Sequence, residues 1–387
     1  MSGADLLVAG GTVLRDGVAE AGDVAIAGGR VVASAAPGSP VLDAAGLLVA
    51  PGLIDVQVNG AVGVDLTYEP ERWPEVASFL PRTGVTSWCP TLITCPLESI
   101  ARAQASVLGA TPEGAAAALG LHLEGPMLSP AYNGAHPVEH QRLPDPALYA
   151  DWSPATGVAL VTIAPELPGA LAAIETLVAR GIAVSVGHSA AGPLEVSAAA
   201  DAGARGVTHL FNAMGALHHR ELGTVGAALA DDRLLCGLIA DGLHVHPAVV
   251  RLAWDRLGPE RTVLVSDAVW ALGAPAGPHR LGDTLVVADG SGVRTGDGRL
   301  AGSLLGLDDG LRTLLAAGAS RADAVAAATA TPAALLGLAD RGHLRPGAVG
   351  DVVLLTPALE VVATVVRGRL AYHRDDVDEA VAAQVAG

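Results

Sequence analysis

Lysine is absent from this sequence of 387 residues, so all 23 basic residues are arginines. They are outnumbered by 40 acidic residues, which gives a net charge of -17. A surface this acidic repels nucleic acids and anionic membranes, and we expect neither as a partner. Aromatic residues make up only 3% of the chain, whereas 51% of it is hydrophobic. Alanine, valine and leucine must therefore fill the core of a globular protein.

Cysteine is scarce as well, since the chain has only Cys89, Cys95 and Cys236. Their odd number and the lack of a paired metal-binding spacing favour a reducing compartment, where they serve as small buried hydrophobic residues. Residues 1–10 carry no basic side chain ahead of an apolar run. No uncharged apolar run approaches the roughly 20 residues of a membrane span. We expect a cytoplasmic protein.

The organisation of the chain indicates an α/β protein. Short β-like runs broken by glycine pairs occupy the first fifty residues and suggest a small antiparallel sheet, and residues 351–355 and 361–366 resemble them. Between these ends, apolar strand-like runs alternate with Ala-rich helical stretches, as in a parallel barrel. The eight strand candidates are Leu53 to Val58, Ser87 to Pro90, Ala118 to Leu123, Val158 to Ile163, Ala183 to Val186, Gly206 to Leu210, Leu235 to Ile239 and Thr262 to Val265.

This pattern predicts a (β/α)8 TIM-type barrel over residues 51–343. Residues 1–50 and 344–387 are expected to form a small β-sandwich domain built from both chain termini. A glycine-punctuated hairpin of unassigned role is expected over residues 281–299.

Three side chains that can bind metals lie at or just past the ends of strand candidates: Glu124, His188 and His209. A carboxylate with two neutral imidazoles is a common ligand set for a catalytic divalent ion that keeps open positions for water. Each residue alone is more often part of hydrogen-bonded structure. Because strand ends of one barrel meet at the same face, the three together favour a metal site.

Asp267 follows the last apolar strand directly. Beside an activated water it could take a proton and later deliver it to a leaving amine. The alternative is a plain helix N-cap. His244 and Arg220 lie in loops of an otherwise acidic protein and suggest an anionic ligand group, although a solvated surface position is an equal alternative for Arg220.

The order of the motifs is more specific than any one of them. Taken together, they resemble the N-acetylglucosamine-6-phosphate deacetylases of the amidohydrolase superfamily over nearly the whole chain. The motifs are residues 51–60 (PGLIDVQVNG), 122–126 (HLEGP), 134–137 (GAHP), 187–189 (GHS), 209–214 (HLFNAM), 241–244 (DGLH), 266–268 (SDA) and 300–303 (LAGS).

The resemblance implies roles for the matching residues. Glu124, His188 and His209 would bind the metal, and Asp267 would activate water and protonate the amine. Further residues would contact the substrate. Ala135 and His136 would line the sugar site, with His136 near the acetyl carbonyl, and His244, Arg220 and the backbone of Asn212 and Ala213 would hold the phosphate. In the family the arginine reaches across a dimer interface, which implies a homodimer.

The sequence departs from common family patterns at two places. Many amidohydrolases begin the barrel with His-x-His and bind a second metal, whereas this chain has Gln57 and Asn59. Amide side chains are poor ligands for a zinc-like ion, so we expect one divalent metal, with zinc ahead of iron, cobalt, manganese or cadmium. The second departure is Tyr132-Asn133 at a place where many relatives carry basic residues, which puts the electrostatics of substrate entry in doubt.

The predicted reaction is hydrolysis of N-acetyl-D-glucosamine 6-phosphate to D-glucosamine 6-phosphate and acetate. One alternative is another hydrolase on the same scaffold that acts on N-acetylgalactosamine 6-phosphate or on a non-phosphorylated amide. A second alternative is a catalytically silent binding protein, which the intact Glu124, His188, His209 and Asp267 argue against.

Overall fold

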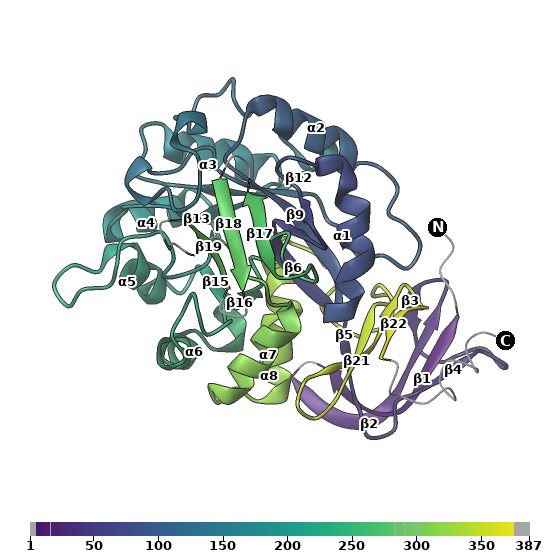
Figure 1. The fold of residues 1–387 in the computed structure, drawn as a ribbon. Helices are drawn as coiled ribbons and strands as arrows, with labels where there is room; N and C mark the ends of the chain where they lie inside the picture. The colour runs from purple at the N-terminus through teal and green to yellow at the C-terminus, as the bar shows by residue number, and fades with distance from the viewer. Residues whose placement is uncertain are drawn as a thin grey trace.

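The computed structural model describes residues 5–15, 17–281, 284–289, 292–296, 298, 300 and 302–374. Figure 1 shows a barrel surrounded by helices and, beside it, a separate sheet in which purple N-terminal strands and yellow C-terminal strands lie together. No helix of the described residues is long and apolar enough to cross a membrane.

The separate sheet has eight strands in the order β22-β21-β20-β5-β1-β2-β3, with β4 paired to β1. β1 runs parallel to β4 and β5, and the other pairs are antiparallel, so the sheet is mixed. Both chain termini contribute to it, as expected. Its strands are β1 (Leu6–Arg15), β2 (Val18–Ala27), β3 (Arg30–Val32), β4 (Val41–Asp43), β5 (Leu48–Pro51), β20 (Val352–Leu355), β21 (Val361–Val366) and β22 (Arg369–His373).

The barrel is a parallel sheet that runs from β6 through β9, β11, β12, β13, β14 and β15 to β16, with β10 extending the β9 edge beside β11. A parallel bridge joins Val58, at the end of the first strand, to Ala268, three residues past the last strand, which closes the barrel and confirms the predicted fold. The strands are β6 (Leu53–Val58), β9 (Val85–Ile93), β10 (Ala117–Ala118), β11 (Leu121–Glu124), β12 (Val158–Ile163), β13 (Ala183–Val186), β14 (Gly206–Val207), β15 (Leu235–Ile239) and β16 (Thr262–Val265).

Helices pack around the barrel, so its strands are buried on both faces. All six residues of β6 are buried, which explains why the strand candidates are continuous apolar runs. The helices are α1 (Trp73–Phe79), α2 (Leu97–Val107), α3 (Ala170–Ala179), α4 (Pro193–Asp201), α5 (Gly223–Ala230), α6 (Pro247–Arg261), α7 (Leu307–Ala316), α8 (Arg321–Ala327) and α9 (Ala330–Leu335).

Short 3-10 helices complete the connections. Three of them, η3, η4 and η5, take the place of an α-helix between β11 and β12. Their bounds are η1 (Pro70–Arg72), η2 (Leu80–Thr83), η3 (Pro130–Tyr132), η4 (Val138–His140) and η5 (Pro154–Thr156).

The segment expected as a hairpin is a three-stranded antiparallel sheet of β17 (Gly277–Leu281), β18 (Thr284–Asp289) and β19 (Gly292–Thr295). It begins before the predicted range, and Arg299, where that range ends, lies outside the described residues. Val286, Ala288 and Val293 pack against residues 269–271, just after β16. A small pair, β7 (Gly60–Ala61) and β8 (Val64–Asp65), follows β6.

Candidate active site

The carboxyl ends of the barrel strands meet around one cavity of about 190 Å³. Glu124 is the last residue of β11, and His188, His209 and Asp267 each follow their strand by two residues. All four line this cavity. The structure therefore brings together the residues that the strand-end pattern singled out, because parallel strands of one barrel end at the same face.

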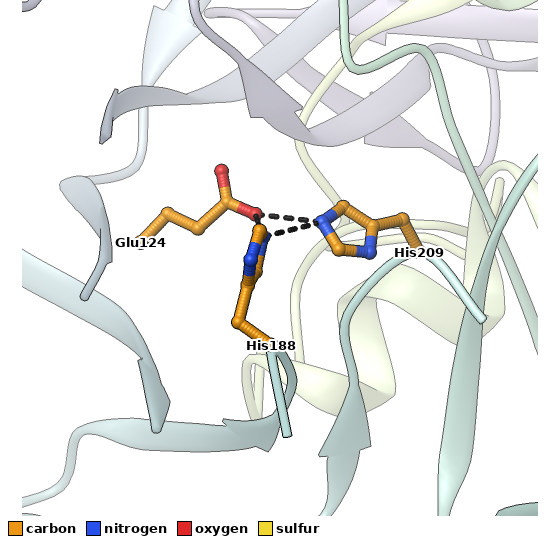
Figure 2. Close-up of side chains that lie close together, drawn as sticks. All are labelled: Glu124, His188 and His209. Atoms are coloured by element: carbon orange, nitrogen blue, oxygen red, sulfur yellow. Dashed lines mark hydrogen bonds and ion pairs between the residues drawn. The ribbon is translucent and has the colours of Figure 1, made fainter. Parts of the chain in front are cut away.

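Glu124, His188 and His209 point toward one another from three strands (Figure 2). The Glu124 Oε1 atom lies 2.8 Å from Nε2 of His209 and 3.1 Å from Nε2 of His188. The two Nε2 atoms are 3.1 Å apart. One ligand atom from each residue lies within 4.8 Å of the others, and all three residues are buried. A carboxylate and two imidazoles at this spacing fit a divalent cation.

The His188 ring is oriented by the loop after β11. Its Nδ1 lies 2.8 Å from the carbonyl oxygen of Tyr132, which can only accept, so Nδ1 carries the proton. The lone pair of Nε2 then faces Glu124 and His209. The Ser129 N–H also donates to the His188 carbonyl at 2.9 Å. Ligating histidines commonly donate their other ring N–H in this way, which supports the fit to a metal.

Protons compensate the charge of this group when no cation is bound. Burial alone would raise the pKa of Glu124, but its contacts with His188 and His209 hold it well below its usual range. Burial alone would lower the pKa of His209, yet the hydrogen bond and charge of Glu124 raise it. A divalent cation would take over the role of the His209 proton.

Asp267 is held by two side-chain amides. Its Oδ1 accepts from Nδ2 of Asn59 at 2.7 Å and from Nε2 of Gln57 at 3.1 Å. Burial and, after it, repulsion by Glu124 raise the pKa of Asp267 to about 6. A carboxyl group with such a pKa can accept and return a proton near neutral pH.

His136 is buried beside the three ligands, with its Nε2 atom 3.7 Å from Oε2 of Glu124. The Thr94 backbone N–H donates to its Nδ1 at 3.1 Å, so the neutral ring carries its proton on Nε2. Burial, followed by the charge of His188, lowers the pKa of His136 to about 3. His136 is therefore a neutral donor that points into the site.

Five residues in or beside the site that are not glycine have a positive φ: His188 (48°), His209 (29°), Phe211 (81°), Ala213 (46°) and Asp267 (49°). Left-handed backbone at such residues costs energy and is concentrated at functional sites. The turn after each strand aims the ligand side chain into the barrel mouth.

The residues expected at the sugar and phosphate divide into two groups. Ala135, His136, Asn212, Ala213 and His244 line the cavity. The Nδ1 atom of His244 lies 2.7 Å from Oδ2 of Asp241, and although burial alone would raise the pKa of that aspartate, the His244 hydrogen bond lowers it.

Arg220 does not line the cavity of its own chain. It is exposed, and its guanidinium lies 2.7 Å from Nε2 of His219 in the loop between β14 and α5. The structure of one chain thus brings His244 to the cavity but leaves Arg220 outside it.

Sequence reasoning missed two kinds of contact. Gln57 and Asn59 were interpreted only as lost metal ligands, although they hold Asp267. Thr94 orients His136 from a loop after β9, where no sequence signal marks it. Asp65, the last residue of β8, and Thr67 also line the cavity, and the sequence did not predict the short β7–β8 pair that positions them.

Comparisons with known proteins identify relatives over the whole fold. Residues 48–371 match the model of the amidohydrolase family. The chain is 42% identical to human N-acetylglucosamine-6-phosphate deacetylase over 355 residues, which cover 86% of this chain and 85% of the human protein. It is 40% identical to an Escherichia coli O157:H7 N-acetylgalactosamine-6-phosphate deacetylase over 331 residues, 84% of this chain and 88% of that protein.

A solved structure of similar fold is a variant of N-acetyl-D-glucosamine-6-phosphate deacetylase from Mycobacterium smegmatis in complex with N-acetyl-D-glucosamine-6-phosphate. It is 33% identical, has a TM-score of 0.87 and covers 95% of this chain and 100% of its own.

Proposed function

The chain belongs to the amidohydrolase family, and from this premise we propose that it hydrolyses N-acetyl-D-glucosamine 6-phosphate to D-glucosamine 6-phosphate and acetate. The observation that carries the proposal is the convergence of Glu124, His188, His209 and Asp267 on one cavity. The human and M. smegmatis relatives, whose names state this activity, support the choice of substrate.

Glu124, His188 and His209 would hold one divalent cation, and zinc suits this nitrogen and oxygen donor set. When bound, the cation would supply a Lewis acid that lowers the pKa of water and polarises the amide carbonyl. Gln57 and Asn59 stand where a second pair of ligands would be needed, and amides are weak ligands for such ions. We therefore propose a single ion.

Asp267 takes a proton from the attacking water while the new C–O bond forms at the carbonyl carbon. His136 donates its Nε2 proton in a hydrogen bond to the oxyanion, an effect worth about 3 to 4 kcal/mol for one well-placed donor. Asp267 then delivers its proton to the amide nitrogen as the C–N bond breaks. The amine and acetate are released, and Asp267 is ionised again.

The phosphate requires cationic or N–H donors, and the described residues that line the cavity include no arginine. His244 and the backbone of Asn212 and Ala213 supply part of the recognition from within the chain, although the Asn212 N–H already donates to the His209 carbonyl at 3.0 Å. Arg220, outside the cavity of its own chain, would complete it from the second subunit of a homodimer. Arginine carries a permanent positive charge, so at neutral pH it binds a phosphate better than histidine does.

Acetate release from N-acetyl-D-glucosamine 6-phosphate tests the function, measured on metal-stripped protein before and after zinc is added back. We expect turnover only with metal. N-acetyl-D-glucosamine without its phosphate serves as the control and should be a much poorer substrate. Equal rates on both sugars would contradict the phosphate assignment, and no release with metal present would contradict the activity.

The E. coli relative, named for the galactosamine epimer, makes N-acetylgalactosamine 6-phosphate a second candidate substrate. The two sugars differ only at the C4 hydroxyl, so kcat/KM for both under the same conditions separates them. We propose a cytoplasmic location, which the three free, buried cysteines support.

A further inference from the structure

The seam that closes the barrel places two side-chain amides against two carboxylates. At this seam the Asp267 N–H donates to the Gln57 carbonyl at 3.0 Å, and the Asn59 N–H donates to the Ala268 carbonyl at 2.7 Å. Alternate residues of a strand share a face. Gln57 and Asn59 therefore point to the same side of the seam, toward Asp267.

The hydrogen bonds fix how each amide is turned. Nδ2 of Asn59 lies 2.7 Å from Oδ1 of Asp267. Nε2 of Gln57 lies 3.1 Å from the same oxygen and 3.3 Å from Oε1 of Glu124. An ionised carboxylate only accepts hydrogen bonds, so the nitrogen of each amide must face it. Both N–H groups of Gln57 are then used, one for each carboxylate.

The two oxygens of Asp267 consequently differ. Oδ1 accepts two amide bonds, whereas no group of the described residues hydrogen-bonds to Oδ2. A proton adds more readily to a lone pair that is not already engaged. Among the described residues, the Asn59 side chain hydrogen-bonds only to Asp267, whereas the Gln57 side chain connects Asp267 with the metal ligand Glu124.

We propose that Gln57 and Asn59 are positioning residues that hold Asp267 by Oδ1 and leave Oδ2 as the oxygen that takes and returns the proton. This proposal rests on the proposed function. The two amides do not have the same task, because Asn59 orients Asp267 alone, whereas Gln57 also fixes Glu124 relative to Asp267. Neutral donors thereby stabilise two neighbouring carboxylates without a second cation.

The test compares Asn59→Leu with Gln57→Leu, which remove the donors at similar volume. Asn59→Leu should lower kcat about 10- to 100-fold, because misplacing a reacting group slows the chemical step by about this factor. It should leave KM and zinc affinity unchanged. Gln57→Leu should lower kcat and also weaken zinc binding about tenfold or more, since partners of ligating carboxylates affect metal affinity. Zinc affinity is measured on stripped protein by competition with a fluorescent chelator, independently of turnover.

A solvent deuterium isotope effect on kcat separates misplacement of Asp267 from general damage. It should rise in Asn59→Leu, because proton transfer becomes more rate-limiting. The matched control is Gln104→Leu, which removes a 3.2 Å bond from a buried amide to the Thr156 carbonyl remote from the cavity. This control should lower the melting temperature without changing kcat or the isotope effect.

Either of two results would overturn the proposal. One is a kcat of Asn59→Leu within about threefold of wild type, and the other is an equal loss of zinc affinity in both variants. Asn59→Asp, which keeps the volume but replaces the donor with a carboxylate acceptor beside Asp267, also removes this hydrogen bond and serves if the leucine variant fails to fold. If wild type released no acetate, the proposed function would fail, whereas the zinc affinities would still test the division between the two amides.

Discussion

His188 donates its Nδ1 proton to the backbone carbonyl of Tyr132 at 2.8 Å, so main chain rather than a side chain sets the tautomer of this ligand. Substitutions of the Tyr132 side chain should therefore leave the metal in place. We expect zinc affinity of Tyr132→Ala and Tyr132→Arg within about twofold of wild type, the usual range for a change that removes no buried contact. Chelator competition measures it.

His188→Asn provides the positive control for that measurement, because it removes a ligand atom and should abolish tight binding. A loss of more than about tenfold in Tyr132→Ala would show that the ring, and not only the carbonyl, supports His188. The departure from basic residues at Tyr132-Asn133 would then matter for the metal as well as for substrate entry.

Asp267→Asn should keep the metal but lose turnover. The Asn59 and Gln57 N–H groups would hydrogen-bond to the side-chain oxygen of the new asparagine. Its side-chain nitrogen would then lie at the position of Oδ2, where it cannot accept a proton. General acid–base catalysis contributes about 10²- to 10⁴-fold, so kcat should fall by this order. Steady-state kinetics with metal analysis of the same sample tests it, and near-wild-type turnover would refute Asp267 as proton carrier.

The barrel strands follow from the sequence because each is an apolar run between turns, and β12 and β13 begin and end where predicted. β14 is shorter than the run Gly206 to Leu210, since it ends at Val207. The positive φ of His209 turns the chain there and aims the ring into the cavity. Periodicity cannot reveal a turn that a tertiary site imposes.

Contacts between segments far apart in the chain could not be predicted from the sequence, for another reason. Gln57 lies on the first barrel strand and Asp267 lies two residues past the last one, and only closure of the barrel brings them into contact. Strand-end position predicted that Glu124 and Asp267 face one cavity. It could not predict which amide would bridge them, because that depends on the register of the closing seam.

Metal affinity should fall as the pH is lowered. The charge of Glu124 raises the pKa of His209 in the metal-free protein, so at a pH below that pKa the ring carries a proton that the metal must displace. Zinc binding should release protons, and its dissociation constant should rise toward acidic pH. Calorimetry in buffers of different ionisation enthalpy counts the protons, and a count of zero across this range would contradict a protonated His209.

Arg220 lies outside the cavity of its own chain, and this position gives the dimer proposal a direct test. If the arginine serves the neighbouring subunit, Arg220→Ala damages the site of the partner, whereas Asp267→Asn damages the site of its own chain. In a heterodimer of the two variants, one site combines an intact Asp267 with an intact Arg220 from its neighbour. Random mixing of separately impaired variants should restore about a quarter of wild-type activity, because half of the dimers are mixed and each has one complete site.

The control for this experiment mixes Asp267→Asn with His244→Ala. His244 lines the cavity of the same chain as Asp267, so a mixed dimer of these two variants contains no complete site. We expect no recovery, with kinetics measured after co-refolding and the dimer fraction determined by light scattering. Recovery in neither mixture, with dimers present, would show that Arg220 does not reach the neighbouring cavity, and a monomer in solution would rule out the shared site.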